Sequence, residues 1–410
     1  MQVFLSRQPI FDRDERIVGY ALFYREPTAA DTTAADVEET PERLIVDAFL
    51  GVGLDELVGD QPAYLKVTYD MLLSGSVELL DPRRVVVEVP GDCVDDADVQ
   101  ATCERLKARG YRIAVDGTSQ VVHDATTLGP ALSWCDLVRV DVRRIDRERL
   151  ARLSHSLKAV GVELLAENVE NREMRDICIE LGCGLFQGYE FSMPEVLVRR
   201  DLSIDHLRTF QLMRTLRDMD TTNAKIEEAF RVDLALSYKL LRMVNSASVG
   251  GRGIASIGHA IRLLGRDALY RWLALLLVTG ISDSELEGEI AHTALLRGRL
   301  CELLAAPLGR PAAADTLYIV GLISNLDVLL GVPMVELVEE MDLAAEVRNA
   351  LLDRSGPFGP ALRLVEAYDT GRWDEVLTEC RALGIEATEL ASLYLAALAW
   401  ANDQHMSAVA

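Results

Sequence analysis

The sequence has no run of basic residues and no basic tail. Its 42 Lys and Arg residues are outnumbered by 65 Asp and Glu residues, so the 410-residue chain carries a formal net charge of −23 at pH 7. A field of that sign repels nucleic-acid backbones and anionic lipid surfaces, although a small anion can still enter a local basic pocket. We therefore expect no nucleic-acid partner.

Long apolar segments are also missing. The most apolar run, residues 272–281, is too short to span a bilayer and is expected to be a core helix. The N-terminal MQVFLSRQPIFD has none of the features of a signal peptide. The seven cysteines are scattered at spacings that suit no common zinc pattern, which favours buried thiols in a reducing compartment. We expect a cytoplasmic protein with no membrane insertion.

Residues 1–200 alternate short β-branched runs with segments of helical periodicity. This alternation predicts a mostly parallel sheet, and eight strand candidates predict a closed (β/α)8-like barrel, with a doubly wound open sheet as the alternative. The candidates are Val3–Leu5, Ile17–Tyr24, Ala63–Val67, Arg84–Val89, Arg112–Asp116, Leu137–Asp141, Glu163–Glu167 and Leu185–Phe191. The link between the first two is too short for a parallel crossover, so these two should form an antiparallel hairpin.

Residues 201–410 read differently, because nearly every segment there has helical periodicity. Gly and Pro separate several of the predicted helices. The second half is therefore expected to be an all-α domain, and the boundary is placed at residue 200, where Ser203 could cap the next helix.

Polar residues recur where the predicted strands end. In a barrel of this kind, such positions gather around one mouth, where chemistry is usually found. The set comprises Arg25, Lys66, Glu88, Asp116, Arg139, Asp141, Glu167 and Gln187. Because these residues come from seven successive strands, we expect a present or ancestral site at this mouth.

The first half resembles the EAL domain family, phosphodiesterases that hydrolyse cyclic di-GMP. The resemblance rests on an ordered series of short matches: RQPIFD at 7–12, VGYALFYR at 18–25, VVVEVP at 85–90, AVDG at 114–117, LVRVDV at 137–142, LAENVEN at 165–171 and FQGYEFSMP at 186–194. Members of the family fold as (β/α)8-like barrels with an antiparallel first strand. Active members use two divalent cations, held by carboxylates and an Asn, to activate water.

The resemblance also shows where this sequence departs from the family. Ala21 stands in place of the signature Glu, and Lys66 in place of the Asn ligand. Gly91 and Gly117 replace two further acids, and Arg139 replaces a Lys. Glu88, Asp116, Glu167 and Gln187 are kept. The loss of four ligand positions predicts no metal of the family's kind, no cofactor and no enzymatic activity.

Several functions remain open for such a barrel. The leading hypothesis is a degenerate cyclic di-GMP sensor or scaffold, with Gln8, Arg25, Lys66, Glu88, Asp116, Arg139, Glu167 and Gln187 as the ligand-binding residues. In it, Lys66 and Arg139 pair with phosphates where metals once sat. One alternative is that these cations pair with Glu88, Asp116 and Asp141 in a collapsed pocket. Others are a residual phosphodiesterase with one metal on Glu88, Asp116 and Glu167, and a partner-binding scaffold that binds no nucleotide.

The second half resembles the HDOD family, a helical relative of HD phosphohydrolases that lacks the metal centre. The resemblance rests on LSYKLLRMVNSA at 236–247 and IASIGHAIRLLG at 254–265. Where metal-binding relatives would read His-Asp, this chain has Ser324-Asn325, and His259 and His292 are expected to be surface or hydrogen-bonded residues rather than ligands. The resemblance implies that this half docks a protein partner, and that the EAL-like half can pair into a homodimer.

Overall fold

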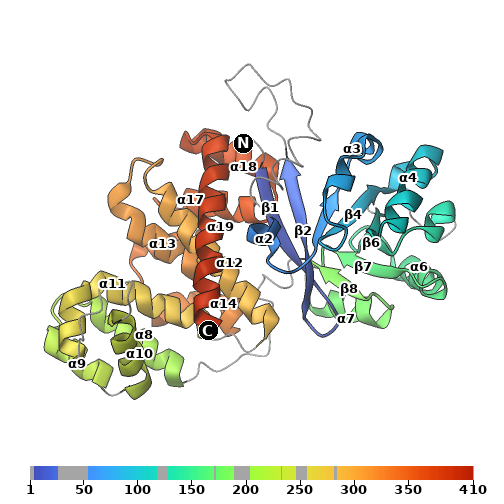
Figure 1. Cartoon of the computed structure of the whole chain (residues 1–410). Coiled ribbons are helices and arrows are strands. Elements are labelled where there is room, and N and C mark those ends of the chain that lie inside the picture. Colours follow the sequence, from blue (N-terminus) through green and yellow to red (C-terminus); the bar gives the residue numbers. More distant parts are fainter. Residues whose placement is uncertain are drawn as a thin grey trace.

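The barrel and the helical half lie side by side in the computed structural model of the chain (Figure 1). The structure describes residues 4–25, 54–117, 128–169, 172–188, 204–231, 233–245, 256–280 and 284–409. The predicted domain boundary at residue 200 falls outside these residues and stays a prediction.

The first half is a closed barrel with the strand order β1-β2-β3-β4-β5-β6-β7-β8. Its strands are β1 (Phe4–Phe11), β2 (Ile17–Arg25), β3 (Ala63–Lys66), β4 (Val85–Pro90), β5 (Arg112–Asp116), β6 (Leu137–Asp141), β7 (Glu163–Glu167) and β8 (Leu185–Gln187). The predicted barrel is confirmed, and the open-sheet alternative is wrong. From β2 to β8, each strand is parallel to the strand that follows it along the chain.

The strands β1 and β2 form the predicted antiparallel hairpin. In its turn, the Asp12 carboxylate accepts hydrogen bonds from the backbone N–H groups of Asp14 and Arg16, at 2.8 and 2.9 Å. Strand β1 then closes the barrel by an antiparallel pairing of Phe11 with Phe186 in β8. This strand is thus the seam of the barrel.

Short helices follow the strands on the outside of the barrel. They are α2 (Leu54–Val58), α3 (Tyr69–Ser74), α4 (Ala97–Ala108), α6 (Arg147–Ala159) and α7 (Arg172–Glu180). Asp96 and Asp146 cap α4 and α6 by accepting hydrogen bonds from first-turn N–H groups.

Alternation along the strands builds the barrel interior in layers. An apolar layer is formed by Ile10, Ala21, Tyr64, Val86, Ala114, Leu137, Leu165 and Leu185. Two residues further along β3 to β8, towards their carboxyl ends, come Lys66, Glu88, Asp116, Arg139, Glu167 and Gln187. The polar residues therefore lie directly above a packed apolar floor.

The second half is helical throughout its described part. Its helices are α8 (Ile204–Arg217), α9 (Asn223–Arg231), α10 (Leu234–Val244), α11 (Ile257–Thr279), α12 (Glu285–Leu304), α13 (Ala314–Ile323), α14 (Leu326–Leu330), α15 (Met334–Glu340), α16 (Ala345–Asp353), α17 (Gly359–Asp369), α18 (Trp373–Leu383) and α19 (Ala387–Val409). Within α11, Gly265 has φ 79° and ψ 170°, so the segment is two helices meeting at a kink.

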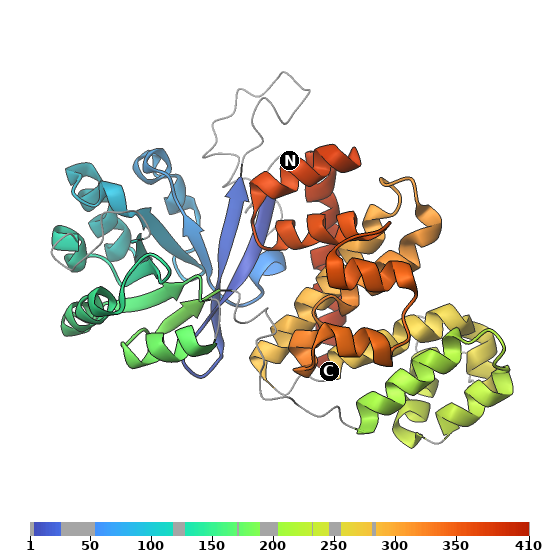
Figure 2. The same ribbon diagram turned by 180° about the vertical axis from the view of Figure 1, so that it is seen from behind.

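The two halves meet where α17 and α19 pack on the outer face of β1, and α19 also contacts α2. Figure 2 shows the same contact from behind. One hydrophobic core cluster contains residues of both halves, including Leu5 and Leu22 of the hairpin and Leu398 of α19. The halves therefore share a core as well as a surface contact.

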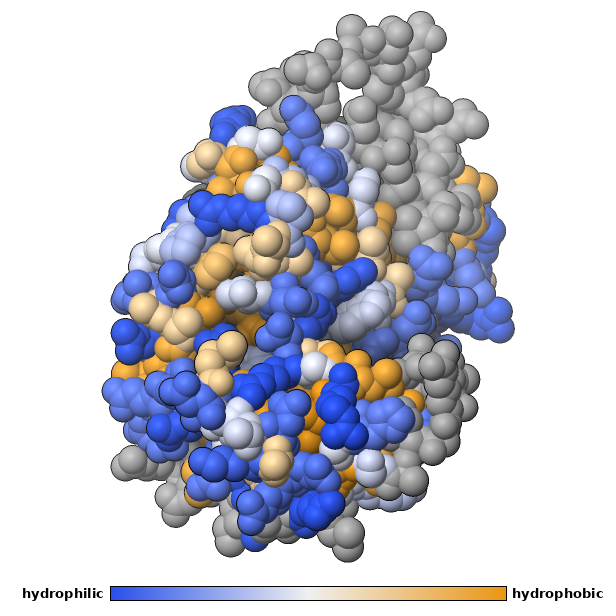
Figure 3. Space-filling model, turned by 90° about the vertical axis from the view of Figure 1, so that its left-hand side faces the viewer, coloured by the Kyte–Doolittle hydropathy of each residue, from blue (hydrophilic) through white to orange (hydrophobic). Residues whose placement is uncertain are grey.

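The outer face of the helical half mixes hydrophilic and hydrophobic residues (Figure 3). Its exposed large hydrophobic residues include Met219, Tyr238, Leu263 and Val335. Among the described residues, no single helix is long and apolar enough to cross a membrane; one sharply bent pair, Trp373–Leu383 with Ala387–Gln404, passes the length and composition criteria together.

Candidate functional site at the barrel mouth

A cavity of about 390 Å³ opens at the carboxyl ends of the barrel strands, within the size range of small-molecule sites. It is lined by Ala21, Leu22, Phe23, Lys66, Val67, Thr68, Glu88, Pro90, Asp116, Arg139, Glu167 and Trp373. Five of the eight predicted ligand-binding residues are in this lining. The strand-end positions therefore converge, as the barrel geometry requires.

Arg139 is the centre of a buried polar network beneath this cavity. Its guanidinium donates to both carboxylate oxygens of Glu88, pairs with Glu167 at 3.1 Å, and donates to Gln187 Oε1 at 2.9 Å. Gln187 Nε2 in turn donates to Gln8 Oε1 at 2.7 Å. The predicted residues Gln8 and Gln187 thus support the site through Arg139 and do not line the cavity.

Burial controls the ionisation of this network. It raises the pKa of Glu88, and the nearby Arg139 cation opposes that rise. Burial alone would lower the pKa of Arg139, but Glu88 and Glu167 outweigh it and raise that pKa further above its ordinary value. Because Arg139 stays charged and only 6% of its side chain is exposed, it acts as a fixed cation in the cavity wall.

Lys66 is the more accessible of the two described cations that line the cavity. Its ammonium donates to Asp116 Oδ2, and 57% of its side chain is exposed against 9% for Asp116. Asp141, expected in the same cluster, instead accepts hydrogen bonds from Arg143, which lower its pKa against the effect of burial. The ion pairs of that alternative are present for Lys66 with Asp116 and for Arg139 with Glu88, whereas Asp141 pairs with Arg143 and the cavity between them stays open.

Two predicted positions remain. Ala21 is 2% exposed and lines the cavity with a methyl group where the family carries a carboxylate. Arg25 ends β2, and its side chain lies outside the described part of the structure.

The donor set does not fit the two-metal centre of the EAL family. Glu88 and Asp116 already accept hydrogen bonds from Arg139 and Lys66, and Glu167 pairs with Arg139. Among the described residues, no group of three or more His, Cys, Asp or Glu side chains is placed to hold a metal ion.

The mouth also contains a residue from the other half of the chain. Trp373, the first residue of α18, lines the cavity together with Ala21 and Phe23 of β2. Trp373 is not among the predicted site residues, because nothing in the residues around position 373 indicates a contact with a strand near the N-terminus. Only the packing of the two halves brings them together.

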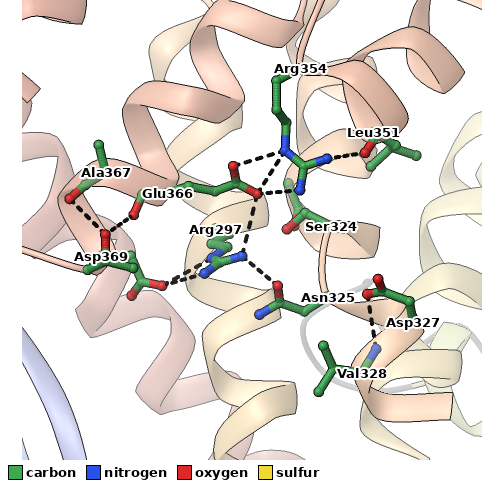
Figure 4. A network of polar contacts seen from close by, with 12 residues as sticks. Arg297, Ser324, Asn325, Asp327, Val328, Leu351, Arg354, Glu366, Ala367 and Asp369 are labelled. Atoms are coloured by element: carbon green, nitrogen blue, oxygen red, sulfur yellow. Dashed lines mark hydrogen bonds and ion pairs between the residues drawn. The ribbon is translucent and has the colours of Figure 1, made fainter. Parts of the chain in front are cut away.

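The helical half has its own buried polar network, shown in Figure 4. Arg297 of α12 pairs with Asp369 of α17 at 2.8 Å and donates to Asn325 Oδ1. Ser324 donates to the carbonyl oxygen of Gly321 at 2.7 Å. Of the two residues at the expected His-Asp position, Asn325 thus links to α12, whereas Ser324 bonds within the end of α13.

The two histidines singled out from the sequence lie in different surroundings. His259 is exposed. His292 is buried and contacts Arg7 and Asn402, so it is a hydrogen-bonded histidine of the interface between the halves.

Comparison with known proteins identifies both halves. Residues 72–194 match the EAL domain, and residues 207–351 match the HDOD domain. The uncharacterized protein YuxH of Bacillus subtilis (strain 168) is 31% identical over 409 residues, which cover 98% of this chain and 99% of that protein. This chain belongs to the same EAL–HDOD family.

A second relative of this EAL–HDOD chain changes the functional interpretation. Cyclic di-GMP phosphodiesterase CdgJ of Vibrio cholerae serotype O1 is 29% identical over 408 residues, covering 98% of this chain and 92% of that protein. The prediction that the EAL–HDOD chain is not an enzyme is contradicted by this relative. That prediction assumed that activity requires every known EAL ligand residue. CdgJ, which matches this chain over nearly the full length of both proteins, is nevertheless named as an enzyme.

Several solved structures resemble part of this chain. A calcium and cyclic di-GMP complex of BlrP1 from Klebsiella pneumoniae is 19% identical, with a TM-score of 0.40, over 47% of this EAL–HDOD chain and 56% of that chain. At this level the likeness carries no argument about ligand or activity.

Proposed function

We propose that this chain is a cyclic di-GMP signalling protein whose barrel mouth binds cyclic di-GMP. The observation that carries the proposal is the cavity of about 390 Å³ that brings Lys66, Glu88, Asp116, Arg139 and Glu167 together. The name of the Vibrio cholerae relative, matched over almost the whole chain, supports this nucleotide as the ligand.

The chemistry of binding rests mainly on Lys66. Its half-exposed ammonium can pair with a phosphate of the ligand, whereas Arg139 lies deeper and is already held by Glu88 and Glu167. Asp116 competes with that phosphate for the same ammonium. Binding should therefore exchange a Lys66–Asp116 pair for a Lys66–phosphate pair.

This exchange predicts opposite effects for the two partners. Calorimetric titration with cyclic di-GMP should give a Kd about tenfold or more higher for Lys66→Ala, because a charge-assisted hydrogen bond is lost. Asp116→Asn should bind more tightly than the unmodified protein, because the competing carboxylate is gone.

A matched control pair lies at the opposite end of the barrel. Lys107 and Asp136 form an ion pair of 3.1 Å between half-buried side chains, and Asp136 precedes β6. Lys107→Ala and Asp136→Asn should leave the Kd unchanged. Absence of binding heat with the unmodified protein, or equal effects of the two lysine variants, would overturn the proposal.

The second candidate function is hydrolysis of cyclic di-GMP, favoured by the match to CdgJ. Purified protein would be incubated with cyclic di-GMP and Mg²⁺ or Mn²⁺, and linear dinucleotide would be measured by chromatography. Turnover that disappears in Glu88→Gln would establish an enzyme acting at this mouth. Binding of cyclic di-GMP without formation of linear dinucleotide would indicate a receptor.

The remaining predictions concern location and partners. We propose a cytoplasmic protein whose helical half docks a protein partner, supported by exposed hydrophobic residues such as Met219 and Tyr238. Homodimer formation is proposed from the resemblance of the barrel to EAL domains. Light scattering over a concentration series tests it, and a constant monomer mass would reject it.

A further inference from the structure

The helical half contributes an aromatic wall to the barrel mouth. Trp373 lines the same cavity as Lys66 and Arg139, although it belongs to α18. The other aromatic residue in that lining is Phe23 of β2. The cavity thus combines cations on its barrel side with a large ring from the helical side.

Trp373 is held in place by contacts that run back into the hairpin. Its ring meets the ring of Tyr368 edge-on, with centroids 5.3 Å apart, and Tyr368 in turn packs against Tyr394 at 4.6 Å. The Tyr368 hydroxyl accepts a hydrogen bond from the Leu5 backbone N–H at 3.4 Å. Tyr368 is fully buried, so the indole stands on a rigid support.

The turn before Trp373 fixes its approach to the barrel. Gly371 has φ 68°, and a Cβ at that position would lie 3.4 Å from Phe23 Cβ and 3.6 Å from the hydroxyl of Ser6. The backbone therefore passes close to β1 and β2 just before α18 begins. Figure 1 shows α18 beside the ends of these strands.

We propose that a purine base of the bound cyclic dinucleotide stacks on Trp373, so that the helical half completes the nucleotide site of the barrel. This inference rests on the proposed binding of cyclic di-GMP at the mouth. Aromatic side chains are the usual platforms for unpaired bases, and the phosphates of the same ligand would reach Lys66 across the cavity. Occupancy of the mouth is then sensed directly by α17 and α18.

Variants of Trp373 test the inference, with cyclic di-GMP as the probe. Loss of one stacked base should raise the calorimetric Kd about 5- to 150-fold in Trp373→Ala. Trp373→Phe keeps a ring against Tyr368 and should give an intermediate Kd. The matched control is Trp400→Phe, since Trp400 is half-buried, meets Tyr318 edge-on at 6.2 Å and lies outside the cavity lining.

A second readout is tryptophan fluorescence, because a stacked base quenches an indole. Ligand should quench the unmodified protein and Trp400→Phe, and the quenching should be lost in Trp373→Phe. This measurement serves even where Trp373→Ala fails to fold.

The outcomes separate the two proposals. Binding that is equally tight in Trp373→Phe and the unmodified protein, with quenching retained, would overturn the stacking role and leave the barrel-mouth function standing. An unmodified protein that neither releases heat nor changes fluorescence with the ligand would overturn both.

Discussion

The ion pair of Arg139 with Glu88 illustrates what happens to charge at the centre of the barrel. Both side chains are almost fully buried, and Glu167 and Gln187 both contact Nη2 of the guanidinium. A buried pair of this kind adds little net stability over apolar residues, but removing one partner leaves the other charge uncompensated. The contribution of the pair to the free energy of unfolding is therefore best measured by comparing a single variant with a double variant.

Arg139→Met should lower the free energy of unfolding by about 3–5 kcal/mol, because the Glu88 carboxylate is left buried without a cation. The double variant Arg139→Met/Glu88→Leu should recover most of that loss. Urea unfolding monitored by fluorescence measures both. A double variant as unstable as Arg139→Met would show that the loss comes from packing rather than from the stranded charge.

The same variant should have a characteristic pH dependence. The pKa of Glu88 is already raised in the folded protein by burial, and loss of Arg139 removes the cation that opposes the rise. A folded state that binds the proton more tightly than the unfolded state is stabilised as pH falls towards the unfolded Glu pKa of about 4.3.

The stability gap between Arg139→Met and the unmodified protein should therefore narrow from pH 8 to pH 5. Groups far from Glu88 titrate alike in both proteins and cancel in the difference. A gap that is constant or widens over that range would contradict the assignment of Glu88 as the stranded charge.

At the scale of elements, α12 and α13 pack through glycines. A Cβ on Gly321 of α13 would collide with the carbonyl oxygen of Arg297 and lie 2.8 Å from Gly298 Cα in α12. The two helices touch at backbone distance there, and Arg297 carries the network that reaches Asn325 and Asp369. Close packing and the buried polar network therefore depend on each other.

Gly321→Ala should lower the free energy of unfolding by about 1–3 kcal/mol or more, because backbone atoms must move to admit the methyl group. Gly184→Ala is the matched control, since a Cβ at Gly184 meets no heavy atom within 4 Å. Thermal unfolding of the two variants checks this. Equal Tm values would show that α12 and α13 separate without cost.

The elements also show how far the sequence predicts the fold. The bounds of β5, β6 and β7 agree with the predicted ranges, because each is a short, mostly buried run that ends at an acidic residue. Strand β1 was predicted as Val3–Leu5 but runs through Arg7 and Pro9 to Phe11. Pro is tolerated there because β1 pairs along its length only with β2 and meets β8 at one residue pair.

The candidate site was predictable for the same local reason, and only in part. Lys66, Glu88, Asp116, Arg139 and Glu167 each stand two residues beyond an inward apolar position, so strand alternation alone brings them to one mouth. Trp373 has no such local signal. Its position depends on tertiary packing of α17 and α18 against β1 and β2, which sequence periodicity does not encode.

At the scale of the whole molecule, β1 connects the barrel site to the helical half. Gln8 points inward to Gln187, while the neighbouring Arg7 points outward and donates to His292 Nδ1 at 3.0 Å. His292 Nε2 lies 2.8 Å from Asn402 Oδ1, an arrangement that a neutral imidazole protonated on Nε2 satisfies on both sides. The site network and the interface between the halves therefore contain consecutive residues of β1, Gln8 and Arg7.

Arg7 also compensates a buried acid at that interface. Glu289 of α12 pairs with it at 3.6 Å and accepts a hydrogen bond from the Tyr20 hydroxyl at 2.9 Å. Burial raises the pKa of Glu289, and Arg7 opposes that rise. Since the hydrophobic core also runs across this boundary, we expect the two halves to unfold together in the unmodified protein.

Arg7→Met should uncouple the unfolding of the two halves, because it leaves Glu289 buried without its cation at the interface between them. Separation of the halves then returns that carboxylate to water. Hydrogen exchange in moderate urea, followed in peptides from β4–β6 and from α13, should show one common opening free energy in the unmodified protein and two different values in Arg7→Met. Arg7→Met/Glu289→Leu should restore the common value, since no charge is then stranded. Two distinct values already present in the unmodified protein would show that the shared core does not couple the halves, and a signal from ligand stacked on Trp373 would then stop at α18.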